Sequence, residues 1–102
     1  MDIIFEYNNI SASERLESFT EKKLEALYSK YSFITRASVF FKKENISGDA
    51  NQSCGIRLSV PGPQLYASSI ESSFETAIAH TINELKVQLE KKKQTFNSHT
   101  LS

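Results

Sequence analysis

With 102 residues, the chain has room for one domain and too little sequence for a second hydrophobic core. Hydrophobic residues make up 39% of it, with seven Phe and four Tyr, so the composition predicts a packed core and excludes intrinsic disorder. Twelve Lys and Arg balance twelve Asp and Glu, which excludes nucleic-acid binding driven by total charge; only cations gathered on one surface could bind it.

The single cysteine and the polar start of the chain narrow the class of protein further. Cys54 alone cannot form an internal disulfide or a Cys-based zinc cluster. Asp2 and Glu6 interrupt the only apolar start, and no apolar run approaches the length of a membrane span. We therefore expect a soluble, cytoplasmic protein that does not associate with membranes.

The first half of the sequence predicts a strand, a long helix and a second strand. Residues 3–7 are β-prone, and the run stops at two asparagines. Residues 11–14 have the spacing of a capping box, with Ser11 as the N-cap. A helix is expected from there to about Tyr31, because apolar side chains recur at helical spacing. Residues 36–43 then alternate as in a strand with one face better buried.

The second half predicts a hairpin followed by another helix. After a polar, flexible connector over residues 44–52, apolar side chains alternate strictly with Gly55, Arg57 and Ser59, and we expect this apolar side to face the helices. Residues 61–63 form the turn, and residues 65–70 form the returning strand. The inward-facing side chains of the first hairpin strand are Cys54, Ile56, Leu58 and Val60.

A second capping box at residues 72–75, with Ser72 at its start, opens the last predicted helix, which runs to about Lys93. We expect residues 1–93 to form one domain and residues 94–102 a flexible tail. The element order β-α-β-β-β-α predicts an α+β fold. A parallel crossover joins the first two strands, the later strands are antiparallel, and both helices cover one face of a four-stranded sheet.

Charges are segregated on the first predicted helix. At roughly 100° per residue, its four glutamates gather on one flank and its basic residues on the other. Lys23 falls within the apolar stripe, where its stem must run outward along the core; it could be no more than a helix-edge lysine. The acidic flank comprises Glu14, Glu17, Glu21 and Glu25, and the basic flank comprises Arg15, Lys22, Lys23 and Lys30.

The last predicted helix carries lysines on both edges. Lys86 and Lys93 share one edge, Lys91 lies on the other, and Lys92 lies near the end; Glu75, Glu84 and Glu90 dilute this charge. If the two helices pack side by side, two lysine-bearing edges could meet and bind phosphates, because such binding releases counterions. The alternative is that the lysine run only complements the helix dipole.

Three segments resemble the short ribosome hibernation promoting factors and the related ribosome-associated inhibitor, formerly called sigma-54 modulation proteins. The resemblance covers about residues 3 to 93 and implies the same fold; we expect the second, dimerising domain of long-form members to be absent. The segments are Asn8-Asn9 with Ser13-Glu14-Arg15-Leu16, Phe19, Lys23-Leu24 and Leu27; Leu65-Tyr66-Ala67-Ser68; and Phe74-Glu75-Thr76-Ala77-Ile78 with Leu85 to Lys93.

The resemblance also implies a function. Such proteins bind ribosomal RNA of the small ribosomal subunit, where messenger and transfer RNA would lie, and silence translation in starved or stationary-phase cells. Lys23, Lys42, Lys91 and Lys93 match basic residues of the family, whereas Ala26, Glu84 and Val87 replace frequent Lys or Arg. The candidate RNA-binding residues are therefore Lys22, Lys23, Lys30, Lys42, Lys86, Lys91, Lys92 and Lys93.

Two other classes of function remain. An enzyme would have to use His80, His99 or Cys54, but these form no nucleophile–base pair and no metal-ligand spacing. We therefore expect no catalysis, cofactor, metal or small-molecule substrate. The other alternative is a protein-interaction module of the same topology without RNA binding, which the neutral total charge favours.

Overall fold

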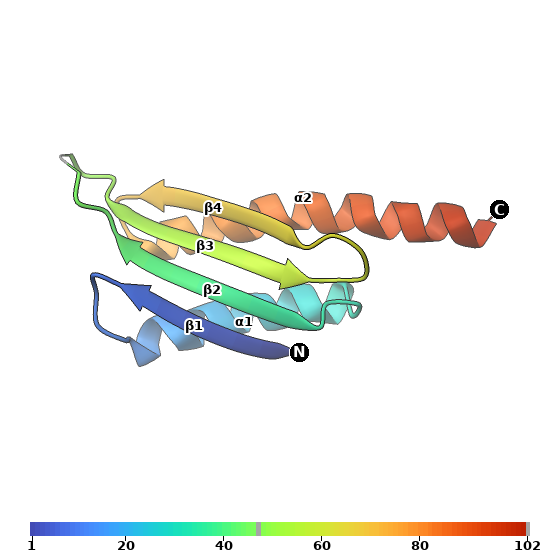
Figure 1. The fold of residues 1–102 in the computed structure, drawn as a ribbon, viewed down its shortest axis with the longest axis horizontal. Helices are drawn as coiled ribbons and strands as arrows, with labels where there is room; N and C mark the ends of the chain where they lie inside the picture. Colours follow the sequence, from blue (N-terminus) through green and yellow to red (C-terminus); the bar gives the residue numbers. More distant parts are fainter. Residues whose placement is uncertain (47, 102) are drawn as a thin grey trace.

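The computed structural model describes residues 1–46 and 48–101, with side chains described as far as Phe96. The elements follow the predicted order (Figure 1). Strand β3 begins two residues before the predicted Cys54, because Gln52 and Ser53 pair with β2. The elements are β1 (Asp2–Asn8), α1 (Glu14–Lys30), β2 (Arg36–Lys43), β3 (Gln52–Ser59), β4 (Leu65–Glu71) and α2 (Phe74–Leu101).

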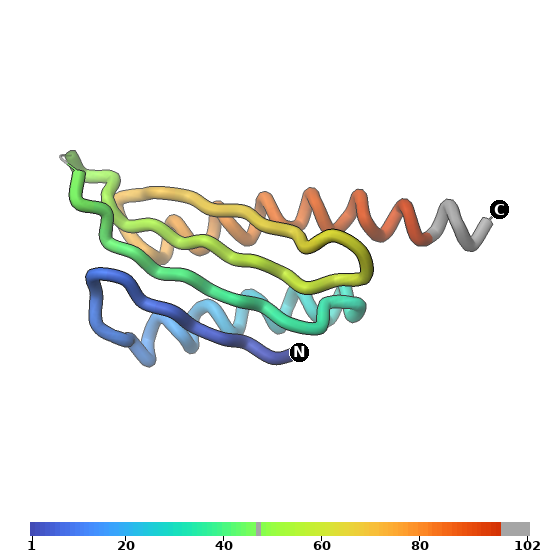
Figure 2. The backbone as a smooth tube through the Cα atoms, viewed as in Figure 1, coloured from blue at the N-terminus to red at the C-terminus, as the bar shows by residue number. Residues whose placement is uncertain are grey.

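The four strands form one sheet in the order β1-β2-β3-β4. Strand β1 is parallel to β2, and the pairs β2–β3 and β3–β4 are antiparallel. Both helices run along the same face of this sheet, with α1 behind β1 and β2 and α2 behind β4, and the other face carries no element (Figures 1 and 2). The predicted α+β fold is confirmed.

The register of the sheet is the one that the alternation of β3 predicts. Cys54, Ile56 and Leu58 are 0% exposed, whereas Arg57 is exposed on the opposite face. A slip of one residue in the register would have exposed the three buried side chains and buried Arg57. Such a slip is disfavoured, because burial of each aliphatic side chain stabilises the fold by about 1.5–3 kcal/mol. From the helices, the core receives Leu16, Leu24, Leu27, Ala77, Ile78, Ile82, Leu85 and Leu89.

Helix α1 begins at Glu14 with Ser13 as its N-cap, so the predicted N-cap at Ser11 is wrong. The Ser13 hydroxyl accepts a hydrogen bond from the Leu16 amide at 3.2 Å, and its carbonyl accepts one from the Glu17 amide at 3.0 Å. The hydroxyl of Tyr7 on β1 lies 2.6 Å from the Glu17 carboxylate and 3.3 Å from the Ser13 carbonyl oxygen. This contact with β1 fixes the first turn two residues later than the local pattern suggested.

Helix α2 likewise begins one residue later than predicted, at a Ser73 cap instead of Ser72. The Ser73 hydroxyl accepts from the Thr76 amide at 3.1 Å. The side chain of Gln52 on β3 accepts from the Phe74 amide at 3.1 Å and donates to the Ser72 carbonyl at 3.3 Å. Because Gln52 already binds the carbonyl of Ser72, that residue lies outside the helix.

The end of α2 also differs from the prediction, since the helix continues to Leu101 and not to about Lys93. No proline or glycine follows Lys93, so nothing in the sequence breaks the backbone hydrogen bonds of the helix. Phe96 packs edge-on against Phe33, which follows α1, with ring centroids 5.1 Å apart. The flexibility of residues 94–102 stays a prediction, and Ser102 lies outside the described residues.

Candidate nucleic-acid interface

Helices α1 and α2 lie side by side and run in the same direction, so that their starts are close together and the end of α1 lies beside Glu90, before α2 continues to Leu101. Near the starts, Arg15 donates to the Glu75 carboxylate at 2.6 Å; near the ends, the Lys30 ammonium lies 3.9 Å from the Glu90 carboxylate. The hydrogen bond from Arg15 lowers the pKa of Glu75. Both pairs are largely exposed, so solvent screens them and each stabilises the fold only weakly. They show, however, that the basic flank of α1 faces α2.

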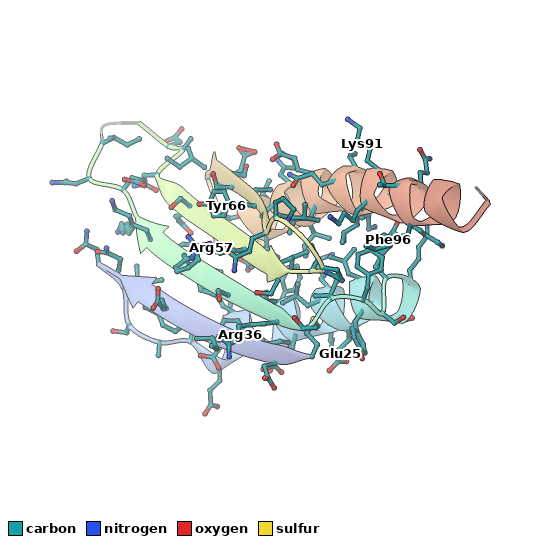
Figure 3. All side chains as sticks on the ribbon, turned by 45° about the vertical axis from the view of Figure 1, so that its right-hand side comes forward. Glu25, Arg36, Arg57, Tyr66, Lys91 and Phe96 are labelled. Carbon is teal, nitrogen blue, oxygen red and sulfur yellow. The ribbon has the colours of Figure 1, made fainter. Side chains whose placement is uncertain are left out.

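The acidic flank of α1 is turned the other way. Glu17 accepts its hydrogen bond from Tyr7 on β1, and burial, together with this carboxylate, raises the pKa of the Tyr7 hydroxyl. Glu25 points to the side of α1 that lies away from α2 (Figure 3). The charge segregation predicted along α1 therefore separates an acidic side near β1 from a basic side at the seam between the helices.

Three of the eight candidate lysines meet at this seam, Lys30 on α1 and Lys86 and Lys93 on α2, and a fourth, Lys23, lies on the same basic flank of α1 as Lys30. We call them the interhelical lysine strip. The half-buried Lys23 places its ammonium 5.1 Å from the Phe19 ring centroid, so its stem runs outward along the core as predicted. The ammonium groups of Lys30 and Lys93 lie 5.4 and 5.8 Å from the centroid of the Tyr31 ring.

Tyr31 and Glu90 occupy the centre of the strip, and the sequence did not single out either of them as a site residue. The Tyr31 hydroxyl donates to the Glu90 carboxylate at 2.6 Å. This hydrogen bond is the main cause that lowers the pKa of Glu90, and the charges of Lys30 and Lys93 act in the same direction. The same bond, with burial, raises the pKa of Tyr31. The Glu90 carboxylate thus holds the Tyr31 ring in place, and the ammonium groups of Lys30 and Lys93 lie over that ring.

A shallow depression of about 510 Å³ lies over this centre. Lys91 lies on its outer border and points away from α1 (Figure 3). Val87, one of the positions where the family often has Lys or Arg, is 57% exposed there. The lining residues are Lys30, Tyr31, Lys86, Val87, Glu90, Lys91 and Gln94.

The remaining candidate lysines lie apart from the strip. The Lys92 ammonium lies 5.5 Å from the Phe96 ring centroid and next to Gly62 in the β3–β4 loop, where a Cβ would come within 2.7 Å of it. Lys42 lies on the open face of the sheet, at the far end of β2 from α2's last turns, and its ammonium is 3.5 Å from the Glu44 carboxylate. Lys22 is exposed on α1 beside Lys23.

The side chains considered for catalysis were those of Cys54, His80 and His99, and the structure describes the first two. Cys54 is fully buried, and burial raises the pKa of its thiol to about 12, so the predicted core thiol is confirmed. His80 lies on the surface with its Nδ1 2.8 Å from the Glu71 carboxylate. The side chain of His99 lies outside the described residues. Among the residues that are described, no three His, Cys, Asp or Glu form a metal-binding group, and no helix is long and apolar enough to cross a bilayer.

Comparison with known proteins identifies the class to which this fold and charge pattern belong. The sequence matches, over residues 3–97, the family described as sigma 54 modulation protein / S30EA ribosomal protein. The chain therefore belongs to this family of ribosome-associated proteins. No curated protein matches the sequence.

Two solved structures share the fold. A ribosomal subunit interface protein from Coxiella burnetii has 21% identity and a TM-score of 0.78, and the match covers 92% of this chain and 99% of that one. The N-terminal domain of Thermus thermophilus Protein Y has 20% identity and a TM-score of 0.75, over 89% of this chain and 98% of that one. At these identities the likeness establishes the fold.

Proposed function

We propose that this protein binds the small ribosomal subunit through its ribosomal RNA, in the channel otherwise used by messenger and transfer RNA. Binding there would inhibit translation in the cytoplasm of starved or stationary-phase cells. Family membership supports the association with ribosomes. The observation that carries the RNA contact is the meeting of two lysine-bearing helix edges, with the acidic flank of α1 turned toward β1.

The interhelical lysine strip explains how a chain of zero net charge could bind phosphates. The ammonium groups of Lys23, Lys30 and Lys93 lie over aromatic rings, and Lys86 lines the depression beside them, on the side of α1 away from its glutamates. Each phosphate that a lysine neutralises releases a counterion, so four such contacts give a slope of log affinity against log salt of roughly −3. The proposed binding is therefore strong at low salt and falls steeply as salt rises.

Co-sedimentation with purified small subunits over a series of salt concentrations tests the proposal. Lys86→Glu should weaken binding by about tenfold, because it replaces a charge-assisted phosphate contact with repulsion. Lys43→Glu makes the same charge change at an exposed position far from the strip and should leave affinity nearly unchanged. Equal losses in the two variants, or wild-type binding that does not depend on salt, would contradict the RNA contact and favour the protein-interaction module.

A further inference from the structure

The face of the sheet opposite the helices carries an aromatic cluster that the proposed function does not use. Arg57 and Tyr66 project from this open face, away from both helices (Figure 3). The strand register places Arg57 opposite Tyr66 and places Phe40 opposite Gly55. These neighbouring cross-strand pairs bring two aromatic rings and one guanidinium together in the middle of the sheet.

The cluster is held in an ordered arrangement. The guanidinium of Arg57 lies over the Phe40 ring, with its carbon 5.5 Å from the ring centroid. The Tyr66 ring lies across Gly55, where a Cβ would come within 2.5 Å of the tyrosine hydroxyl oxygen. Only glycine at residue 55 permits this position of the ring. Covering the glycine stabilises the sheet, yet Tyr66 remains 50% exposed and offers a ring face to solvent.

Two hollows border these rings. One of about 410 Å³ is lined by Phe40, Arg57, Gln64 and Tyr66, and no carboxylate contributes to it. The other, of about 370 Å³, also includes Phe40 and Tyr66, together with Ile70, serines of β3 and β4 and the Lys42–Glu44 ion pair. Among the side chains that the structure describes, Arg57 has no acidic partner within salt-bridge distance. The first hollow therefore suits a flat ligand that carries negative charge.

We propose that this open face binds single-stranded RNA, with a base stacked on Tyr66 and a phosphate at Arg57, beside Phe40. Base–aromatic stacking with a nearby guanidinium is how proteins commonly bind unpaired nucleotides. A protein partner fits less well, because the exposed apolar residues of this face, Ile4 and Ile70, lie on the two outer strands with polar positions between them. The face lies opposite the interhelical lysine strip, so the two sites can be tested separately.

The test is titration of the purified protein with a fluorescent ten-nucleotide oligouridylate at low salt, followed by anisotropy. Tyr66→Leu keeps apolar bulk over Gly55 but removes the stacking ring, and should weaken binding by roughly tenfold, as for one lost base stack. Arg57→Gln should weaken it as well, whereas Tyr66→Phe should bind like the wild type. The matched control is Tyr28→Leu, at an exposed tyrosine on α1.

Other outcomes would overturn the proposal. Loss of binding in Lys86→Glu with full binding in Tyr66→Leu would place the oligonucleotide on the lysine strip. Equal binding of an abasic oligomer of the same length would show that no base is stacked, and absence of binding by the wild type would exclude the site. Thermal unfolding of each variant separates loss of binding from loss of fold. Ribosome co-sedimentation of Tyr66→Leu reports on the proposed function independently.

Discussion

Tyr31 links the hydrophobic core to the charged surface of the protein. Its ring is 2% exposed at the end of α1, while its hydroxyl reaches Glu90 on α2 and the ammonium groups of Lys30 and Lys93 lie over the ring. Glu90 therefore has two opposing effects. It holds the two helices together through Tyr31, and it partly neutralises the lysines that would contact phosphate.

Glu90→Gln should separate these two effects. The folded-state pKa of Glu90 lies below its ordinary value of 4.5, so the ionised carboxylate stabilises the folded protein above that pH. This stabilisation is lost as the pH falls through the folded-state pKa. We expect Glu90→Gln to unfold at a lower temperature than the wild type at neutral pH, with the difference vanishing in acid. The same variant should bind small subunits more tightly, because one negative charge leaves the strip.

Thermal unfolding as a function of pH, together with co-sedimentation, measures both effects. Glu84→Gln provides the control, since it removes the same charge from an exposed position of α2 without an ion pair in the described part of the protein. If the two variants behave alike in both measurements, the assigned role of Glu90 is wrong.

At the scale of the elements, contacts with the sheet determine where each helix begins. Tyr7 on β1 holds the first turn of α1, and Gln52 on β3 holds the first turn of α2. The opposite side of α2 is tied to β4 by Gln88, whose side-chain amide donates to the Tyr66 carbonyl at 2.9 Å. This last bond occupies a carbonyl on an edge strand that would otherwise be free to pair with another chain.

The two serines near the start of α1 provide a matched pair for testing the cap. Ser13→Ala should lower the free energy of unfolding by about 1 kcal/mol, because the Leu16 amide loses its hydrogen-bond acceptor. Ser11→Ala, at an exposed position outside the helix, should change it by less than about 0.5 kcal/mol. Urea denaturation followed by circular dichroism measures both. A larger loss of unfolding free energy in Ser11→Ala than in Ser13→Ala would show that Ser11 is the N-cap, as the sequence suggested.

At the scale of the whole molecule, the neutral total charge conceals surfaces of different character. The seam between the helices carries the lysine strip, the side of α1 toward β1 carries the glutamates, and the open face of the sheet carries the aromatic cluster. Exposed charges more than a Debye length apart, about 10 Å at 0.1 M salt, are largely screened from each other. The salt dependence of RNA binding should therefore report the local charge of the contacting surface and not the net charge of the protein.

Charge added to different surfaces should reveal which of them contacts RNA. Val87→Lys places one cation in the depression over the strip and should steepen the slope of log affinity against log salt by about 1. The double variant Glu21→Lys with Glu25→Lys changes the net charge far more, on the acidic flank of α1, where Glu25 points away from α2, and should leave this slope nearly unchanged. A steeper slope for the double variant than for Val87→Lys, measured by co-sedimentation, would place the RNA on the β1 side.

The local periodicity of the sequence was sufficient to predict the architecture of the fold. The alternation around Ile56 and Arg57 defined the buried face of β3, and the apolar stripes of both helices defined what they bury. The separation of charges on α1 could be read in the same way, because positions on one helix have fixed angular relations. The parallel crossover, the antiparallel pairing of the later strands and the shared helix face followed from this pattern and the lengths of the connections.

The sequence by itself thus determined which side of each element is apolar, basic or acidic, because those relations lie within a single regular element. The tertiary structure decided which of these sides meet. It brought Glu90 to Tyr31 and turned Lys92 toward Gly62. It also selected Ser13 over Ser11, through Tyr7 on another strand. These contacts join residues distant in the chain, and their geometry depends on how the helices pack on the sheet, which no local spacing encodes.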